Sequence, residues 1–178
     1  MRALVLGLMG LAVAACGDTA RAHFPWLAVD GKGRAALFFS EQPQEREYRV
    51  PDCIKDSRVS FRPAAGAIRD VALDVVEEEG FAGRRSAAAV LDRESGGVLC
   101  CPVAYGNYNG MLLTYHAKAF ASGNPAKWSP CEDLTFDVTP RLAAGKLHVA
   151  ATWQGKPLPG AKATLLPNGG EPEEATTD

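Results

Sequence analysis

Short stretches in which apolar residues alternate with polar ones run along most of the chain, and turn residues separate them. Between residues 68 and 75, Val71, Leu73 and Val75 alternate with polar or small side chains. That period of two is typical of a strand with one buried face. A helix over the same stretch is the alternative, because Ala, Glu and Leu favour helices. The pattern predicts strands at residues 34–40, 47–50, 58–61, 68–75, 85–91, 98–105, 111–120, 134–138, 147–153 and 161–166.

Turn signals between these strands indicate where the chain reverses. Residues 106–110 read Gly-Asn-Tyr-Asn-Gly, and Gly and Asn tolerate the positive φ angles of hairpin turns. They predict a hairpin between 98–105 and 111–120. Residues 77–80 (EEEG) are expected to form a solvated turn. Pro140 is expected to end the strand predicted at residues 134–138. Many short strands with frequent turns indicate an all-β fold, and we expect an immunoglobulin-like β-sandwich.

The C-terminal segment, ATWQGKPLPGAKATLLPNGGEPEEATTD, resembles the opening strands of a carboxypeptidase-regulatory-like β module, in which GKPLPGAKATLL supplies a hairpin. Two strands alone are marginally stable, so they are expected to pair with the preceding sandwich or to fray. The alternative for the acidic residues from Asn168 onward is a disordered tail. We therefore expect a signal peptide at 1–22, a β-sandwich domain at 23–143, and a truncated second β module with an acidic tail at 144–178.

The first 22 residues have the pattern of an export signal. One Arg precedes an apolar run over residues 3–15, which is too short to span a bilayer. The small residues around Arg21 predict cleavage after Ala22, which makes His23 the first mature residue. Val13-Ala14-Ala15-Cys16 also resembles a bacterial lipobox, and this alternative leaves a lipid on Cys16. The protein is expected in the periplasm or cell envelope, at a membrane only if Cys16 is lipidated.

Charge and motifs exclude several function classes. With 19 basic and 21 acidic side chains the formal charge is −2, so no basic field exists for a nucleic acid. The chain has no Gly-rich phosphate loop, no HExxH and no GxSxG. Since an exported chain tends to oxidise its thiols, a Cys-His nucleophile is not favoured either. We therefore do not expect an enzyme.

Four cysteines follow the signal region: Cys53, Cys100, Cys101 and Cys131. An even number in an exported chain predicts up to two disulfides, with three connectivities open. Successive side chains of a strand point to opposite faces, so Cys100 and Cys101 are expected to reach different partners. The alternative is that they are small buried hydrophobic residues. No CxxC spacing favours a metal–thiolate site.

Three segments carry a resemblance to a known group: AHFPWL at 22–27, AYGNYNGMLLTYHAKAF at 104–120 and TWQGKPLPGAKATLL at 152–166. Together they resemble exported bacterial proteins of an uncharacterised domain family, grouped with periplasmic components of nickel and cobalt uptake. Planctomycete-type proteins of this kind begin with a signal peptide followed by AHxxWL. The resemblance implies an all-β periplasmic protein with a connection to divalent metals and, as a partner, a metal transporter or another envelope protein. It implies no catalytic residues.

The histidines are the candidate metal ligands. Cleavage after Ala22 would give His23 a free α-amine beside its imidazole, and a second imidazole, from His116 or His148, would complete a site for Ni(II), Co(II) or Cu(II). Both of these histidines are expected on outward strand faces. Lys118, near His116, would oppose a cation, and Asp30 is a weaker candidate for an oxygen ligand. The alternative is that all three histidines are solvated surface residues.

Two functions are consistent with these features. The first is an exported protein that binds or delivers a divalent metal ion. The second is a β-sandwich of the cell envelope with a structural or protein-binding role and no metal chemistry, which the regulatory-like C-terminal pattern favours.

Overall fold

The structure is a computed structural model that describes residues 23–90, 96–122, 124, 128–132, 134–167 and 170–178. The expected signal peptide at 1–22, which includes Cys16, lies outside the described residues, as do the last residue of the strand predicted at 85–91 and Asn168, where the alternative disordered tail begins.

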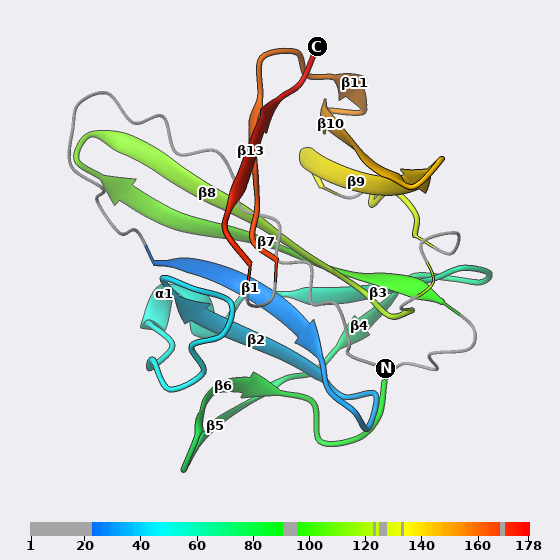
Figure 1. The fold of residues 1–178 in the computed structure, drawn as a ribbon. Helices are drawn as coiled ribbons and strands as arrows, with labels where there is room; N and C mark the ends of the chain where they lie inside the picture. The colour runs from blue at the N-terminus through cyan, green and yellow to red at the C-terminus, as the bar shows by residue number, and fades with distance from the viewer. Residues whose placement is uncertain (1–22, 91–95, 123, 125–127, 133, 168–169) are drawn as a thin grey trace.

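Two antiparallel four-stranded sheets face each other (Figure 1). In the first sheet the order is β1 (Phe24–Val29), β2 (Ala35–Ser40), β6 (Phe81–Arg85) and β5 (Asp74–Glu78). In the second sheet the order is β4 (Arg69–Val71), β3 (Val59–Pro63), β7 (Gly97–Tyr108) and β8 (Met111–Phe120). The expected all-β sandwich is confirmed, and its immunoglobulin-like subtype stays a prediction.

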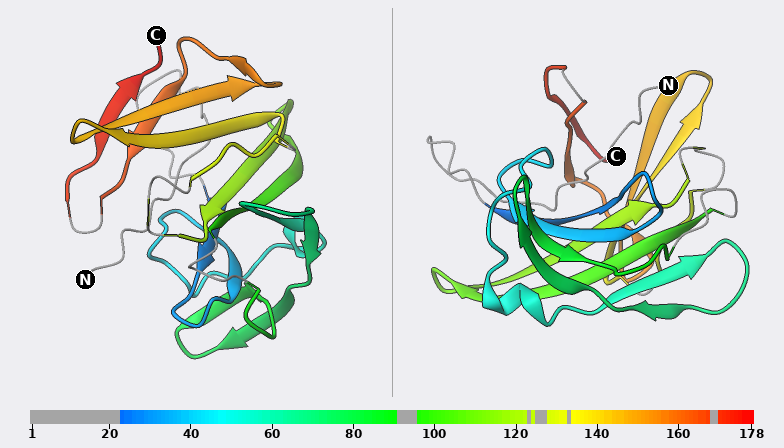
Figure 2. Two further views of the ribbon diagram at one scale, coloured as in Figure 1. Left: turned by 90° about the vertical axis from the view of Figure 1, so that its right-hand side faces the viewer. Right: turned by 90° about the horizontal axis from the view of Figure 1, so that it is seen from below.

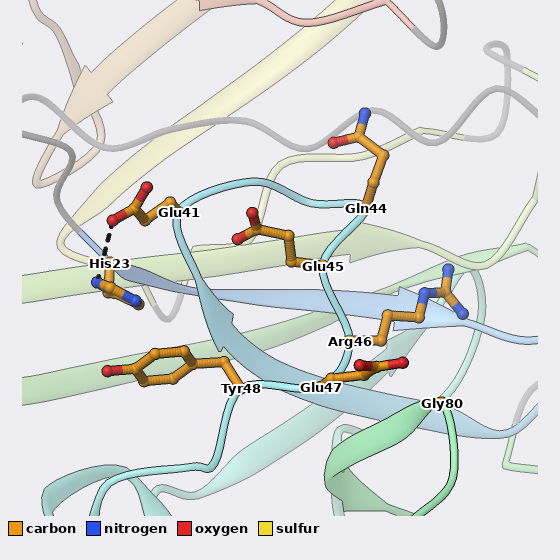
Figure 3. A pocket seen from close by; sticks show the side chains of 8 residues that line it. All are labelled: His23, Glu41, Gln44, Glu45, Arg46, Glu47, Tyr48 and Gly80. Carbon is orange, nitrogen blue, oxygen red and sulfur yellow. Dashed lines mark ion pairs between the residues drawn. The ribbon is translucent and has the colours of Figure 1, made fainter.

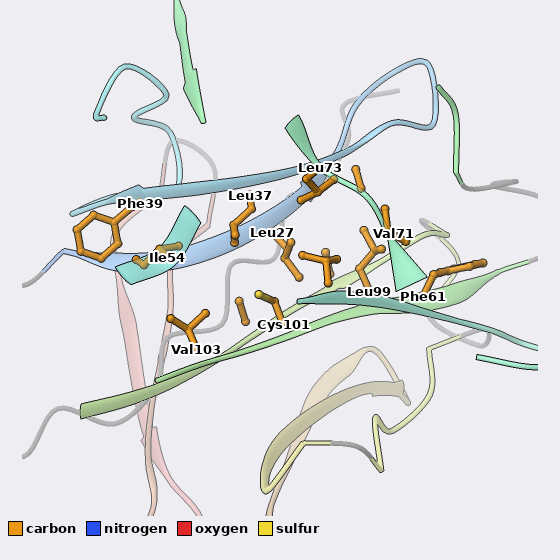
Figure 4. Close-up of a cluster of buried hydrophobic side chains, with 14 of the residues drawn as sticks. Leu27, Leu37, Phe39, Ile54, Phe61, Val71, Leu73, Leu99, Cys101 and Val103 are labelled. Atoms are coloured by element: carbon orange, nitrogen blue, oxygen red, sulfur yellow. The ribbon is translucent and has the colours of Figure 1, made fainter. Parts of the chain in front are cut away.

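The main core lies between these two sheets. Leu27 and Leu37 of the first sheet face Leu99 and Val103 of β7, and all four side chains are buried (Figure 4). The short helix α1 (Asp52–Lys55) adds Ile54 to the same cluster. Burial of large aliphatic side chains contributes about 1.5–3 kcal/mol each, so this cluster is the main source of stability of the sandwich.

A third sheet packs on the other face of the β7–β8 hairpin, at the end away from its turn (Figure 2). It contains β9 (Phe136–Ala143), β10 (Lys146–Trp153) and β11 (Lys156–Pro157), in the order β11-β10-β9. Val98 and Cys100 of β7 pack there against Cys131 and Leu134, and Cys100 is disulfide-bonded to Cys131. The last two strands, β12 (Lys162–Leu165) and β13 (Glu173–Thr176), pair with each other.

The third sheet crosses the expected boundary between residues 143 and 144. β9 and β10 pair along their whole length, from Lys146 opposite Ala143 to Trp153 opposite Phe136. The boundary therefore falls in the turn of a hairpin. β11 pairs with β10 and β12 pairs with β13, so residues 155–166 do not form the expected hairpin. Pairing with the preceding part is confirmed for β10 and is wrong for β12, which among the described strands pairs only with β13.

Several predicted strands have different limits in the structure. Residues 47–50 form no strand, because Val50 is anchored in the core while no neighbouring strand pairs with this stretch. Residues 68–75 contain β4 and the start of β5, separated by a break at 72–73, so the helix alternative is wrong. β6 ends at Arg85, where the predicted strand 85–91 began. Glu77 and Glu78 belong to β5, and the turn contains only Glu79 and Gly80.

Two further expectations about strand ends are wrong. Pro140 lies inside β9, opposite Val149, because β9 is an edge strand where a missing N–H can face away from the ladder. The acidic tail is not disordered throughout, since Glu173–Thr176 form β13 against β12. Ala161 N–H and Thr177 Oγ1 are hydrogen-bonded at 2.9 Å and help to close that hairpin.

Candidate functional site

The pairing of the first two strands brings His23 close to Glu41. Phe24 lies opposite Ser40 in the β1–β2 ladder, so the residues just outside the ladder, His23 and Glu41, are neighbours. The Nδ1 atom of His23 is 3.8 Å from Oε1 of Glu41, and each side chain is about one quarter exposed. Imidazole nitrogen and carboxylate oxygen are both donor groups for metal ions, so this pair can contribute two donors to one ion.

His23 and Glu41 line a pocket of about 710 Å³ (Figure 3). The loop that follows β2 supplies most of the remaining wall, including the carboxylates of Glu45 and Glu47. His23, Glu41 and Tyr48 lie together at one end, whereas Glu47 lies toward Gly80 at the other end. The lining also contains Gln44 and Arg46. Three carboxylates and one guanidinium give the pocket an excess of negative charge that favours a cation.

Aromatic side chains hold the imidazole of His23 in place. Its ring centroid is 4.1 Å from that of Tyr48 and 5.6 Å from that of Phe39. The Tyr115 hydroxyl donates a 3.1 Å hydrogen bond to the backbone carbonyl of His23 and ties the start of β1 to β8. Tyr115 packs edge-on against Tyr105, which stacks on Phe39, so these two tyrosines serve core packing. The aromatic rings thus hold the His23 side chain, and the bond from Tyr115 holds its backbone.

His116 lies on a covered face of β8, which corrects the expectation that it is outward and accessible. Its ring meets Phe136 edge-on at 6.2 Å, and its Nδ1 is buried with no hydrogen-bond partner among the described residues. Burial lowers the pKa of His116, and the charge of Asp137 partly opposes this shift. The third sheet covers this face, and a strand pattern read alone could not reveal that cover.

Lys118, two residues further along β8, is also buried rather than outward. Its Nζ donates hydrogen bonds to both oxygens of Asp137, at 2.8 and 3.1 Å, and to Oγ1 of Thr139 at 3.2 Å. Asp137 also accepts the backbone N–H of Cys131. Burial lowers the pKa of Lys118, and the hydrogen bond with Asp137 opposes this shift. This pair locks β9 onto β8 beside the disulfide.

The structure does not bring the three histidines together. His23 shares the pocket with Glu41, and His116 points to the opposite side of β8 from Tyr115, which bonds His23. His148 is exposed on β10, opposite Arg141. Within the described residues no three side chains of the His, Cys, Asp and Glu types are grouped so that they could hold a metal ion. A site at His23 therefore needs the α-amine as a further donor.

The cysteines divide into one disulfide and two thiols. Cys100 and Cys131 form the disulfide, which confirms that the chain contains at least one. Cys53 is an exposed thiol on α1, and Cys101 is a buried one in the main core. Burial raises the pKa of Cys101 to about 12. The two adjacent cysteines do point to opposite faces, but Cys101 meets apolar side chains rather than a second sulfur.

Glu41 and Tyr48 were not predicted as site residues from the sequence. No strand was predicted over Phe24–Val29, although a turn signal at residues 30–33 precedes the strand at Ala35–Ser40. A hairpin around that turn would have placed His23 opposite Glu41. Asp30 serves this turn, because its carboxylate accepts the N–H groups of Lys32 and Arg34 at 2.8 and 2.9 Å. Asp30 is thus part of the turn that sets the register.

No protein-family model, no curated protein and no solved structure matches this chain. In the part of the chain that the structure describes, no helix has the length and apolar character needed to cross a bilayer.

Proposed function

We propose that the protein is an exported, periplasmic accessory that binds a divalent metal ion, Ni(II), Co(II) or Cu(II), for delivery to a transporter or another envelope protein. The observation that carries the proposal is the approach of the His23 imidazole to the Glu41 carboxylate, 3.8 Å apart at one end of an acidic pocket. The export pattern of residues 1–22 and the resemblance to nickel- and cobalt-uptake components support the same function.

The donor set argues for the nitrogen-preferring ions of this class. In a chain that begins at His23, the α-amine and the imidazole belong to one residue and can chelate one ion. Glu41 adds an oxygen from the neighbouring strand. Mixed nitrogen and oxygen donors in a tetragonal arrangement suit Cu(II) and Ni(II). Glu45 and Glu47 in the same pocket raise the local concentration of cations without having to be ligands.

Isothermal titration of NiCl₂ and CuCl₂ tests this function on three chains. The first begins at His23, the second carries one additional Ala in front of it, and the third begins at His23 and carries Glu41→Gln. We expect the added Ala to weaken binding about 100-fold, because the α-amine moves away from the imidazole. Glu41→Gln should weaken it about tenfold, in line with the loss of one ligand or orienting group. His148→Gln, on an exposed strand position, is the control and should leave the affinity unchanged.

Equal affinity of the first two chains would refute a site at His23. Absence of binding in every chain would favour the second function, an envelope sandwich with a structural or protein-binding role. The intact mass of the protein isolated from cells provides an independent test. A first residue of His23 is required, and a diacylglycerol on Cys16 would place seven residues before it and remove the chelating amine.

A further inference from the structure

The tip of the β7–β8 hairpin exposes large apolar side chains. Leu112 is 77% exposed, Met111 63% and Tyr108 55%. Tyr108 pairs with Met111 on one face of the ribbon, and Leu112 pairs with Asn107 on the other face. All three side chains lie within two residues of the Asn109-Gly110 turn. A projecting group of this kind, as opposed to single scattered residues, is typical of an interaction site.

The tip is a regular turn on a long ribbon. Asn109 and Gly110 have positive φ angles of 50° and 82°, and the Gly110 N–H donates a 2.9 Å hydrogen bond to Oδ1 of Asn107. These features are typical of a two-residue hairpin turn, which matches the twist of the paired strands. Among the described strands, the ribbon extends past the edge of the sandwich in Figure 1 and in the right view of Figure 2.

The ribbon carries no charged residue that would oppose entry into an apolar medium. Residues 95–117 contain no Asp, Glu, Lys or Arg, although 22% of the chain is charged. Burying a charge in an apolar environment costs far more than burying a hydroxyl or an amide. The polar groups at the tip are the Tyr108 hydroxyl and the Asn side chains, which suit the boundary between lipid headgroups and acyl chains.

The first described strand, β1, begins at the same end of the sandwich as this tip. The Tyr115 hydroxyl holds the His23 carbonyl at 3.1 Å. Residues 1–22 contain the apolar run at 3–15 and Cys16, both directed to the membrane by their sequence pattern. Seven residues from Cys16 to His23 span at most about 25 Å. In a chain that keeps these residues, a lipid on Cys16 or an uncleaved signal would therefore bring the tip close to the bilayer. That chain is the alternative to the one that begins at His23, in which the tip has to dock without this tether.

We propose that Tyr108, Met111 and Leu112 dock the protein on a lipid surface, with Leu112 and Met111 inserted among the acyl chains and Tyr108 at the headgroup level. The contact needs no anionic lipid, because the tip has no basic residue. It is independent of the metal site, since His23 lines a separate pocket that contains none of these three side chains.

Co-sedimentation with vesicles tests this proposal. The chain from His23 onward keeps every described strand and lacks residues 1–22, which would bind lipid by themselves. We expect it to bind vesicles of phosphatidylcholine alone and vesicles that also contain phosphatidylglycerol to a similar extent. Met111→Glu with Leu112→Glu should lower the partition coefficient by about tenfold or more. Leu142→Glu is the matched control, because Leu142 is 57% exposed on another sheet, and it should leave partitioning unchanged.

A second variant reports on the tip without removing its apolar character. Leu112→Trp should show a blue shift of its fluorescence on phosphatidylcholine vesicles, beyond any change in the chain without this substitution. No sedimentation of the unsubstituted chain, no additional blue shift in the Leu112→Trp variant, or an equal loss with Leu142→Glu would overturn the proposal. Self-association that Met111→Glu with Leu112→Glu abolishes would assign the tip to a second copy of the chain and would overturn it as well.

Discussion

The Asp137 carboxylate accepts hydrogen bonds from three groups in the interior of the protein. These are the Lys118 ammonium, the Thr139 hydroxyl and the backbone N–H of Cys131. The side chains of Lys118 and Asp137 are each only 6% exposed. A buried ion pair is tolerated when its geometry is good and additional hydrogen bonds satisfy the remaining groups, as they do here.

Removing one charge of this pair should be strongly destabilising. Asp137→Asn leaves the buried Lys118 ammonium without its counter-ion, so the free energy of unfolding should fall by about 3–5 kcal/mol in urea titrations. Asp70→Asn is the matched control, because Asp70 pairs with Arg58 at the surface, where such pairs contribute about 0–1 kcal/mol. An equal fall in the free energy of unfolding in the two variants would contradict the stabilising role of the buried Lys118–Asp137 pair.

His116 should make stability depend on pH. Burial lowers its pKa in the folded protein, so the unfolded chain takes up the proton at a higher pH, near 6.5. Below pH 6.5 the unfolded state therefore binds more protons, and the free energy of unfolding falls as the pH drops toward the folded pKa. The total loss is about 1.4 kcal/mol for each unit that separates the two pKa values.

Urea titrations from pH 7 to pH 5 measure this effect. His116→Gln should show a shallower fall in the free energy of unfolding than the unsubstituted protein. His148→Gln, on an exposed position of β10, should retain the original slope. If the free energy of unfolding fell equally with pH in His116→Gln and in the unsubstituted protein, this pH dependence would not come from His116.

At the scale of elements, the disulfide fastens the second and third sheets together. Cys100 belongs to β7, Cys131 lies in the segment leading to β9, and the two are 31 positions apart in the sequence. Closing a loop of that length stabilises a fold by about 3–4 kcal/mol in the chain-entropy account. Cys100→Ser with Cys131→Ser should lower the free energy of unfolding by this amount. Cys53→Ser, at an exposed free thiol, should change it little, and a comparable loss there would contradict this role.

Strands were predictable where local chemistry and tertiary pairing agree. The β7–β8 hairpin follows from the Asn109-Gly110 turn and two long apolar runs. β6 was misplaced because its sequence, FAGRR, has poor strand propensity. Its Arg84 donates hydrogen bonds to distant carbonyls, from Nη1 to Ser57 at 2.7 Å and from Nη2 to Leu73 at 3.2 Å, while its buried Nε has no partner among the described residues. Tertiary contacts that no local pattern reveals therefore stabilise this strand.

The candidate site was predictable only in part, for the same reason. His23 stands out by its place after a cleavage pattern, but Glu41 is 18 residues away and becomes its neighbour only through the β1–β2 register. His116 was expected to be accessible because alternation defines two faces of a strand and does not say how many sheets will cover them. Here both faces of β8 near His116 are packed.

At the scale of the whole molecule, the pairing of β9 with β10 across residues 143 and 144 argues against a separate module that begins at residue 144. β9 lies at the edge of that sheet, with β10 as its neighbour. The Asp137 and Thr139 side chains of β9 bond Lys118 of β8. β12 and β13 pair with each other and with no other strand in the described part of the chain. Stability should therefore depend much more on β10 than on the last hairpin.

Two truncations of the chain from His23 onward separate these contributions. Ending the chain after Leu158 removes β12 and β13 but keeps the bond from Leu158 N–H to the Ala151 carbonyl. This truncation should cost about 1 kcal/mol or less, because the buried side chain that it removes, Ala161, is small. Ending the chain after Ala143 leaves β9 without its strand partner and exposes the Lys118–Asp137 pair to water.

The shorter chain should lose at least about 3 kcal/mol, since a whole ladder and the burial around it are lost together. Urea unfolding followed by tryptophan fluorescence measures both chains through Trp26, which is buried in the first sheet and is present in each. If residues from 144 onward formed an independent module, the two truncated chains would be equally stable. Equal urea midpoints of the two truncated chains would therefore support a domain boundary after residue 143 and refute the proposal that the three sheets form one unit.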